Sequence, residues 1–126
     1  MDFQIITNNP LVKEKLSQYP VQLNEALSYL DVLLQVRTKV QEGYKLLSHP
    51  LAGSVKPKET PYKSIMLSTA AGAGIDAGSE LIIENCLLLY DSFADRQRLY
   101  TEKVQADFQY IDYTLIKSAV DSAVVI

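Results

Sequence analysis

The sequence predicts an α/β domain, and two observations carry this prediction. Through residue 69, short apolar runs with β-branched residues alternate with amphipathic helical segments, which is the pattern of strands joined by helices. From Ser79 to the end the chain has neither glycine nor proline, as is typical of a long helical segment. We therefore expect a small layered domain with a roughly four-stranded, mostly parallel sheet of order 2-1-3-4. Helices should flank the sheet, and a long C-terminal helical segment should follow it.

The first strand is expected at residues 3–7, where the run FQIIT is apolar and β-branched. It ends at Asn8, Asn9 and Pro10. Asn9 is a good helix N-cap, and Pro10 suits the first helical position, where a missing N–H costs nothing. A short helix over residues 11–17 should follow.

A second strand over 19–23 has Pro20 near its start, which favours an edge position. Ser28 followed by Asp31 resembles a capping box that opens the next helix, and Gly43 should end it. The face of this helix toward the core should consist of Tyr29, Val32, Leu33, Val36 and Val40.

A third strand is expected at 44–47 and a fourth at 64–69, separated by a proline-rich loop over 48–63. The first three strands should be parallel, whereas the direction of the fourth stays open because the loop permits either connection. Within residues 70–78, the segment 72–77 matches a dinucleotide-binding pattern, but no strand follows it. We interpret residues 70–78 as a flexible connection of small residues.

An unbroken helix over 79–122 would be roughly 66 Å long, whereas a domain of this size is about 35–40 Å across. We expect a break in the polar interval 91–98, with helices at about 79–93 and 100–122. The resulting organisation is an α/β domain over 1–98 and a C-terminal helical extension over 99–126. The extension should pack on the domain or on a partner subunit, and its apolar end favours a homodimer through these helices.

Composition excludes several function classes. The net charge of −3 argues against a general nucleic-acid binder, and no apolar run reaches the ~18 residues of a membrane helix. The single Cys86 cannot form an internal disulfide, which favours the cytoplasm, and it should be a buried, inert thiol. With one cysteine and one histidine, we expect no metal site and no cofactor.

The most plausible site lies where the ends of the first and third strands would meet, at the switch point of a doubly wound sheet. One loop holds Asn8 and Asn9, which suit either an anion at a helix N-terminus or plain capping. The other holds His49, the only histidine of the chain, which is either an acid–base residue or a loop histidine. Prolines stiffen this second loop.

Three segments resemble the GrdX family: TNNPLV at 7–12, VR at 36–37, and above all LLSHPLAGSVKPKETPYKS at 46–64. The resemblance covers about the first 95 residues. Members are small cytoplasmic proteins encoded with the glycine, sarcosine and betaine reductase systems of anaerobic, amino-acid-fermenting bacteria. The resemblance implies association with a selenoprotein-dependent reductase, and it transfers no catalytic role.

We expect an accessory or regulatory protein of the glycine reductase system, and we favour this role over an enzyme. It would bind a reductase component or a small anionic metabolite through loops 7–10 and 48–63, and neither nucleic acid nor membrane. One alternative is a small enzyme with His49 as acid–base and Lys56 stabilising negative charge; another is a dimeric structural module. The residues expected to bind the ligand are Asn8, Asn9, Pro10, His49, Gly53, Ser54, Lys56, Thr60 and Tyr62.

Overall fold

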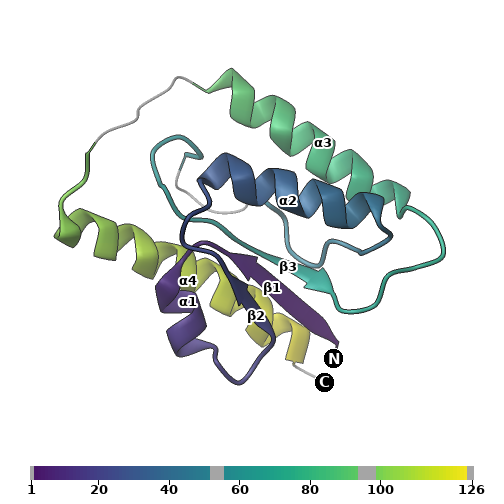
Figure 1. The fold of residues 1–126 in the computed structure, drawn as a ribbon, viewed down its shortest axis with the longest axis horizontal. Coiled ribbons are helices and arrows are strands. Elements are labelled where there is room, and N and C mark those ends of the chain that lie inside the picture. Colours follow the sequence, from purple (N-terminus) through teal and green to yellow (C-terminus); the bar gives the residue numbers. More distant parts are fainter. Residues whose placement is uncertain (1, 52–55, 94–98, 125–126) are drawn as a thin grey trace.

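The computed structural model describes residues 2–51, 56–93 and 99–124. Its centre is a three-stranded mixed sheet with helices on both faces (Figure 1). In chain order the elements are β1 (Phe3–Thr7), α1 (Pro10–Lys15), β2 (Val21–Leu23), α2 (Tyr29–Gln41), β3 (Ser64–Ser68), α3 (Ala77–Ser92) and α4 (Glu102–Val124).

The expected α/β class is confirmed, but the sheet differs from the prediction in strand number and direction. The observed order is β2-β1-β3. β1 pairs with β2 in parallel, so that Ile5 lies beside Val21, and with β3 in antiparallel, so that Ile5 also lies beside Met66. The sheet is therefore mixed rather than mostly parallel, and the expected fourth strand lies directly beside the first.

The expected third strand, residues 44–47, forms only one bridge, between Leu46 and Leu67. The hydroxyl of Ser48, not a main-chain carbonyl, accepts the N–H of Met66 at 2.9 Å, and this ends the ladder. A parallel connection needs a crossover, usually a helix, and the described part of the proline-rich loop contains none. The chain therefore returns antiparallel, and β3 separates residues 44–47 from β1.

The local signals for the helices are confirmed. Asn9 caps α1 by accepting the N–H of Leu11 at 3.0 Å, and Pro10 is the first helical residue. Ser28 and Asp31 form the expected capping box of α2. Gly43 ends this helix with φ of 103°, a conformation that glycine adopts without strain.

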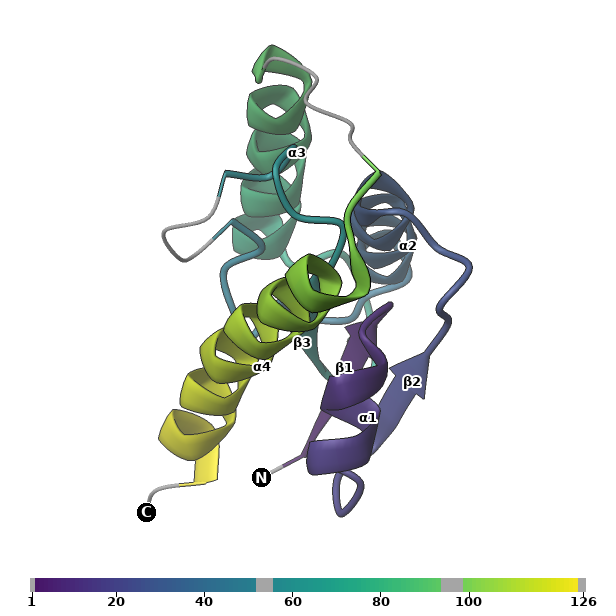
Figure 2. The same ribbon diagram turned by 90° about the vertical axis from the view of Figure 1, so that its left-hand side faces the viewer.

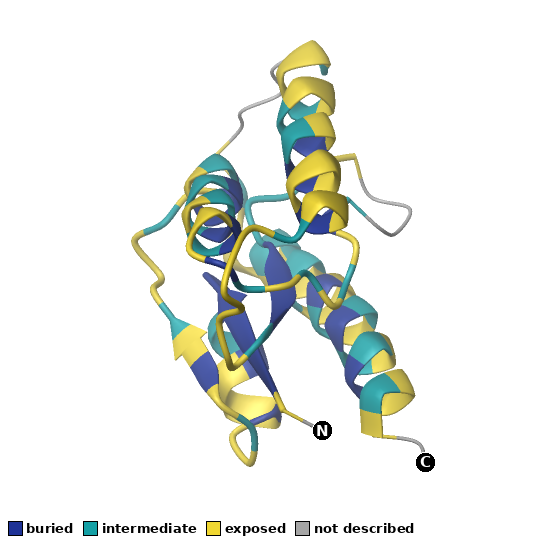
Figure 3. Ribbon diagram, turned by 90° about the vertical axis from the view of Figure 1, so that its right-hand side faces the viewer, coloured by how far each residue is buried: buried dark blue, intermediate teal, exposed yellow. Residues whose placement is uncertain are grey.

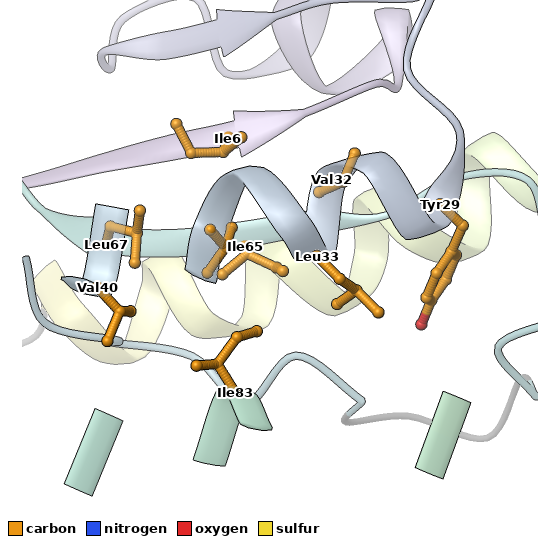
Figure 4. Packing of buried hydrophobic residues seen from close by; sticks show 9 residues of the cluster. Ile6, Tyr29, Val32, Leu33, Val40, Ile65, Leu67 and Ile83 are labelled. Carbon is orange, nitrogen blue, oxygen red and sulfur yellow. The ribbon is translucent and has the colours of Figure 1, made fainter. Parts of the chain in front are cut away.

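Each face of the sheet has its own hydrophobic core. On one face α2 and α3 pack against side chains from β1 and β3, and on the other face α1 and α4 do so (Figure 2). Figure 4 shows the first core, in which Ile6 and Ile65 from the sheet lie against α2, with Ile83 of α3 beneath. The predicted inward residues of α2 are all buried: Tyr29, Val32, Leu33, Val36 and Val40.

The C-terminal half consists of two helices, and the break expected at 91–98 is confirmed, since α3 ends at Ser92 and α4 begins at Glu102. α4 packs against α1 and β3 and buries Ile116 and Val120 in the second core. α3 is more exposed, as the yellow bands along it in Figure 3 show. Cys86 is buried, as expected. In the part of the chain that the structure describes, no helix is both long and apolar enough to cross a membrane.

Candidate functional site

An open cleft of about 980 Å³ lies between α2, α3, residues 57–62 and the start of α4. Its apolar walls come from helix α2, helix α3 and the tyrosines that project between them. The rings of Tyr29 and Tyr90 stack with their centroids 5.5 Å apart and form one side. The apolar lining residues are Leu27, Tyr29, Leu30, Leu34, Pro57, Pro61, Tyr62, Leu87, Leu88, Tyr90, Leu99 and Tyr100.

Asn8 holds the floor of this cleft in place. Its Nδ2 donates to the carbonyl oxygens of Leu27, at 2.9 Å, and Pro61, at 2.8 Å. Its Oδ1 accepts the N–H of Lys63 at 2.9 Å. One buried amide at the end of β1 therefore joins the segment before α2 to the segment before β3, because both need hydrogen-bond partners that no strand supplies there.

Helix α4 and the segment just before it support the other side of residues 57–62. Nε2 of Gln109 donates to the hydroxyl of Tyr62 at 2.9 Å, and the hydroxyl of Tyr100 donates to the carbonyl of Glu59. The N–H of Tyr62 is bonded to Oγ1 of Thr60, at 3.2 Å, in a local turn. These bonds make residues 59–62 a supported wall of the cleft.

The charges around the cleft are mixed, with more acidic than basic side chains. The basic groups are Arg37, which lies 3.8 Å from Glu84, and Lys58, whose ammonium lies 5.0 Å from the centre of the Tyr90 ring. Both ion-pair partners are about 40% exposed or more, so this contact adds little stability. The acidic lining residues are Glu25, Glu59, Glu84 and Asp91.

A buried polar cluster lies beside the cleft, where β1 ends and β3 begins. The carboxylate of Asp112 on α4 accepts hydrogen bonds from Nδ2 of Asn9, at 3.0 Å, and from Oγ and N of Ser64, at 2.7 and 3.1 Å. The hydroxyls of Thr7 and Ser64 share a further bond of 2.6 Å. Burial raises the pKa of Asp112, although these donors and the charge of Lys63 lower it in part.

The structure divides the predicted ligand-binding residues into separate groups. Asn8, Thr60 and Tyr62 line the cleft. Asn9 and Pro10 are committed to the start of α1. Lys56 is exposed, whereas Gly53 and Ser54 lie outside the described residues.

The two predicted loops do reach the same edge of the sheet, since Ser64 lies beside Thr7 and Met66 is bonded to Ser48. β3 lies between them. His49 is exposed, its Nδ1 accepts the N–H of Leu51 at 3.1 Å, and it is not among the residues that line the cleft.

Lys63 and Asp112 are the residues that sequence reasoning missed. The sequence did contain a signal that Lys63 is buried, because Lys63 precedes the apolar residues Ile65 and Leu67 by two and four positions. Alternate residues of a strand face the same side, so Lys63 faces the core on the side of α2 and α3. Burial lowers its pKa. No comparable signal marks Asp112, whose partners lie far away in the sequence.

Comparison with known proteins adds the family. A family model described as GrdX-like protein matches residues 4–121, so the match continues beyond the first 95 residues and includes most of α4. No curated protein and no solved structure matches the chain. Since the family model covers nearly the whole sequence, the protein belongs to the GrdX-like family.

Proposed function

We propose that this GrdX-like protein is a non-catalytic accessory protein of the glycine reductase system that binds a small metabolite in the cleft between α2, α3 and residues 57–62. The pathway context comes from the family. The site is our inference from one observation, the supported cleft of about 980 Å³. Pockets for small molecules are typically ~300–1,000 Å³, mostly apolar, with a few placed polar groups.

Three further features support this site. Asn8, Thr60 and Tyr62 belong to the segments that carry the family resemblance, and all three line the cleft. Asn8 and helix α4 hold the wall formed by residues 59–62 from both sides, so the cavity is formed before a ligand arrives. A preformed site loses less conformational entropy on binding than a flexible one.

We favour binding over a reaction catalysed by His49, because the exposed side chain of His49 lies outside the cleft lining. The polar groups of the cleft also change the expected ligand. Two basic and four acidic side chains line it, so a ligand with an anionic group would have to place that group near Arg37 or Lys58. We therefore propose a ligand with an apolar part and at most one anionic group.

A thermal-shift panel of small monocarboxylates with apolar groups, together with glycine, acetyl phosphate, phosphate and nucleotides, tests the proposal, since a ligand that binds only the folded state raises the melting temperature. The matched variants are Leu88→Arg and Leu81→Arg, because both leucines are exposed on α3, at 71% and 63%, but only Leu88 lines the cleft. Leu88→Arg should weaken binding by about tenfold, as expected for losing part of one buried leucine contact.

Leu81→Arg should bind the ligand with the same affinity as the wild type. Equal weakening by both variants would contradict the assignment of the cleft. A flat panel together with co-purification of a reductase subunit, lost in Leu88→Arg, would show that the cleft binds a protein and not a metabolite.

A further inference from the structure

Lys63 is a buried lysine for which the structure provides no partner. Its side chain lies just before β3, and the residue is 6% exposed. Among the described residues, none forms a hydrogen bond or an ion pair with its Nζ. Lysine is almost never buried without a partner, because removing the ammonium from water is costly. A residue placed this way at a cost to stability is a candidate for chemistry.

Lys63 lines a small cavity of about 20 Å³, together with Asp112 and residues of α4. Tyr29, Thr60 and Tyr62 line both this cavity and the large cleft, so the two adjoin. A space of this size accommodates about one water-sized group. Every fully buried side-chain nitrogen and oxygen of the described residues has a partner, so the unpaired Nζ must keep some accessible surface.

The surroundings of Lys63 favour the neutral amine. Burial lowers its pKa, and the charges of Asp112 and Cys86 oppose this only in part. The titratable groups that face it are Tyr29 on α2, Cys86 on α3, Asp112 on α4 and Tyr62 in the preceding loop. Burial raises the pKa of the Tyr29 hydroxyl and the Cys86 thiol, which disfavours their anionic forms. The Asp112 carboxylate is the remaining negative group, and its hydrogen bonds go to Asn9 and Ser64 rather than to Nζ.

We propose that Lys63 is a covalent binding site for carbonyl compounds: its amine condenses reversibly with a small aldehyde or ketone that enters through the cleft. This inference rests on the proposed function and specifies the chemical class of the ligand. An amine that is neutral and partly desolvated is a nucleophile, which is how lysines form Schiff bases.

The reaction balances without a further reactant. The lone pair of Nζ attacks the carbonyl carbon, the carbonyl π pair moves to oxygen, and a proton passes from nitrogen to that oxygen to give a carbinolamine. Loss of the hydroxyl group and of the second amine proton as water then forms the C=N bond. The sum is amine plus carbonyl giving imine plus water, with no change of oxidation state, and hydrolysis reverses it.

The test is to incubate the full chain with acetaldehyde and sodium cyanoborohydride near neutral pH and to map the ethylated lysines by peptide mass spectrometry. The reductant converts any imine to a stable secondary amine. A lowered pKa raises the neutral fraction of the amine, so Lys63 should be labelled several-fold faster than the exposed Lys56.

The controls are Lys63→Met, Lys63→Arg and Lys56→Arg, each checked for its fold by circular dichroism. Both changes at position 63 should remove the fast label, and Lys56→Arg should leave it unchanged. Labelling of Lys63 no faster than that of Lys56 in the folded protein overturns the inference, as does binding of acetaldehyde that the reductant does not trap.

Leu88→Arg separates this inference from the function on which it rests. Slower labelling in this variant supports entry through the cleft, whereas unchanged labelling overturns that route. If Lys63 stays unlabelled while Leu88→Arg still weakens the binding of a ligand from the thermal-shift panel, the carbonyl chemistry is wrong and the cleft remains a binding site.

Discussion

The side-chain amide of Asn9 donates a hydrogen bond to the carboxylate of Asp112, 3.0 Å away, across a separation of 103 residues. The same carboxylate accepts two bonds from Ser64. One side chain of α4 therefore holds the end of β1 and the beginning of β3 together. This edge of the sheet also supports the cleft, since Asn8 and Lys63 directly adjoin the residues that Asp112 binds.

Asp112→Ala should lower the free energy of unfolding by about 2–4 kcal/mol. Removal of the carboxylate breaks three buried hydrogen bonds, one from Asn9 and two from Ser64. Asn9 keeps its bond to the Gln109 carbonyl and the Ser64 hydroxyl keeps Thr7, but the N–H of Ser64 loses its acceptor, and an unsatisfied buried group costs about 1–3 kcal/mol. Urea denaturation measures the effect. Asp107→Ala is the control, because Asp107 is exposed on the same helix, and it should change stability by less than about 0.5 kcal/mol. Equal effects of the two changes would contradict the role of Asp112.

Lys63→Met should stabilise the protein most at neutral pH and less as the pH rises. The pKa of Lys63 is lowered in the folded state from 10.5. Between that lowered value and 10.5 the unfolded chain therefore holds a proton that the folded chain lacks. The stability of the wild type thus rises with pH in this window, whereas the stability of the methionine variant lacks this contribution from position 63.

Urea denaturation of both proteins at about pH 7 and about pH 10 checks this prediction. The difference between variant and wild type should shrink at the higher pH. Lys56→Met, at an exposed position, should show no such trend. A difference that grows with pH would mean that Lys63 is held as a cation in the folded state.

Gly43→Ala should destabilise the protein by more than about 1 kcal/mol, whereas Gly74→Ala should be neutral or slightly stabilising. A Cβ at Gly43 would lie 2.7 Å from the carbonyl oxygen of Gly72, and its φ of 103° is unfavourable for alanine. At Gly74 a Cβ would meet nothing within 4 Å. Thermal melting of the two variants compares them directly, and similar losses would contradict this account of the Gly43 turn.

His49→Ala should leave ligand binding in the cleft unchanged within a factor of about two, a difference of ~0.4 kcal/mol. The imidazole is exposed, accepts a bond from the N–H of Leu51, and lies outside the cleft lining. Titration of the best ligand of the thermal-shift panel measures this. A large loss of affinity would restore the hypothesis that His49 belongs to the site.

The sequence predicts those parts of the fold that local chemistry decides. Asn9 and Pro10 define the start of α1, and Ser28 and Asp31 define that of α2. Their capping bonds join residues within four positions of each other. The break between α3 and α4 follows from length alone. The order and direction of the strands cannot be predicted in this way. The direction of β3 depends on which pairing buries more apolar surface, and the chain near Leu46 is compatible with either arrangement.

The candidate site is predicted only in part, for a related reason. Asn8, Thr60 and Tyr62 stand out because they adjoin prolines and strand ends, where the chain must satisfy its own backbone. The α2 and α3 walls of the cleft come from ordinary apolar positions, which a helical pattern cannot distinguish from core. Lys63 differs from these residues, since it is a charged residue just before β3 that faces inward like Ile65 and Leu67, and such local conflicts tend to mark function.

The bond between Asn9 and Asp112 also has a consequence for biosynthesis. The ribosome makes β1 long before α4, so Asn9 is synthesised 103 residues ahead of the carboxylate that accepts its hydrogen bond. In a nascent chain that lacks α4, the polar groups of Asn9 and Ser64 have to stay hydrated, because buried donors need an acceptor. Synthesis of α4 is therefore the step that allows this end of the sheet to close.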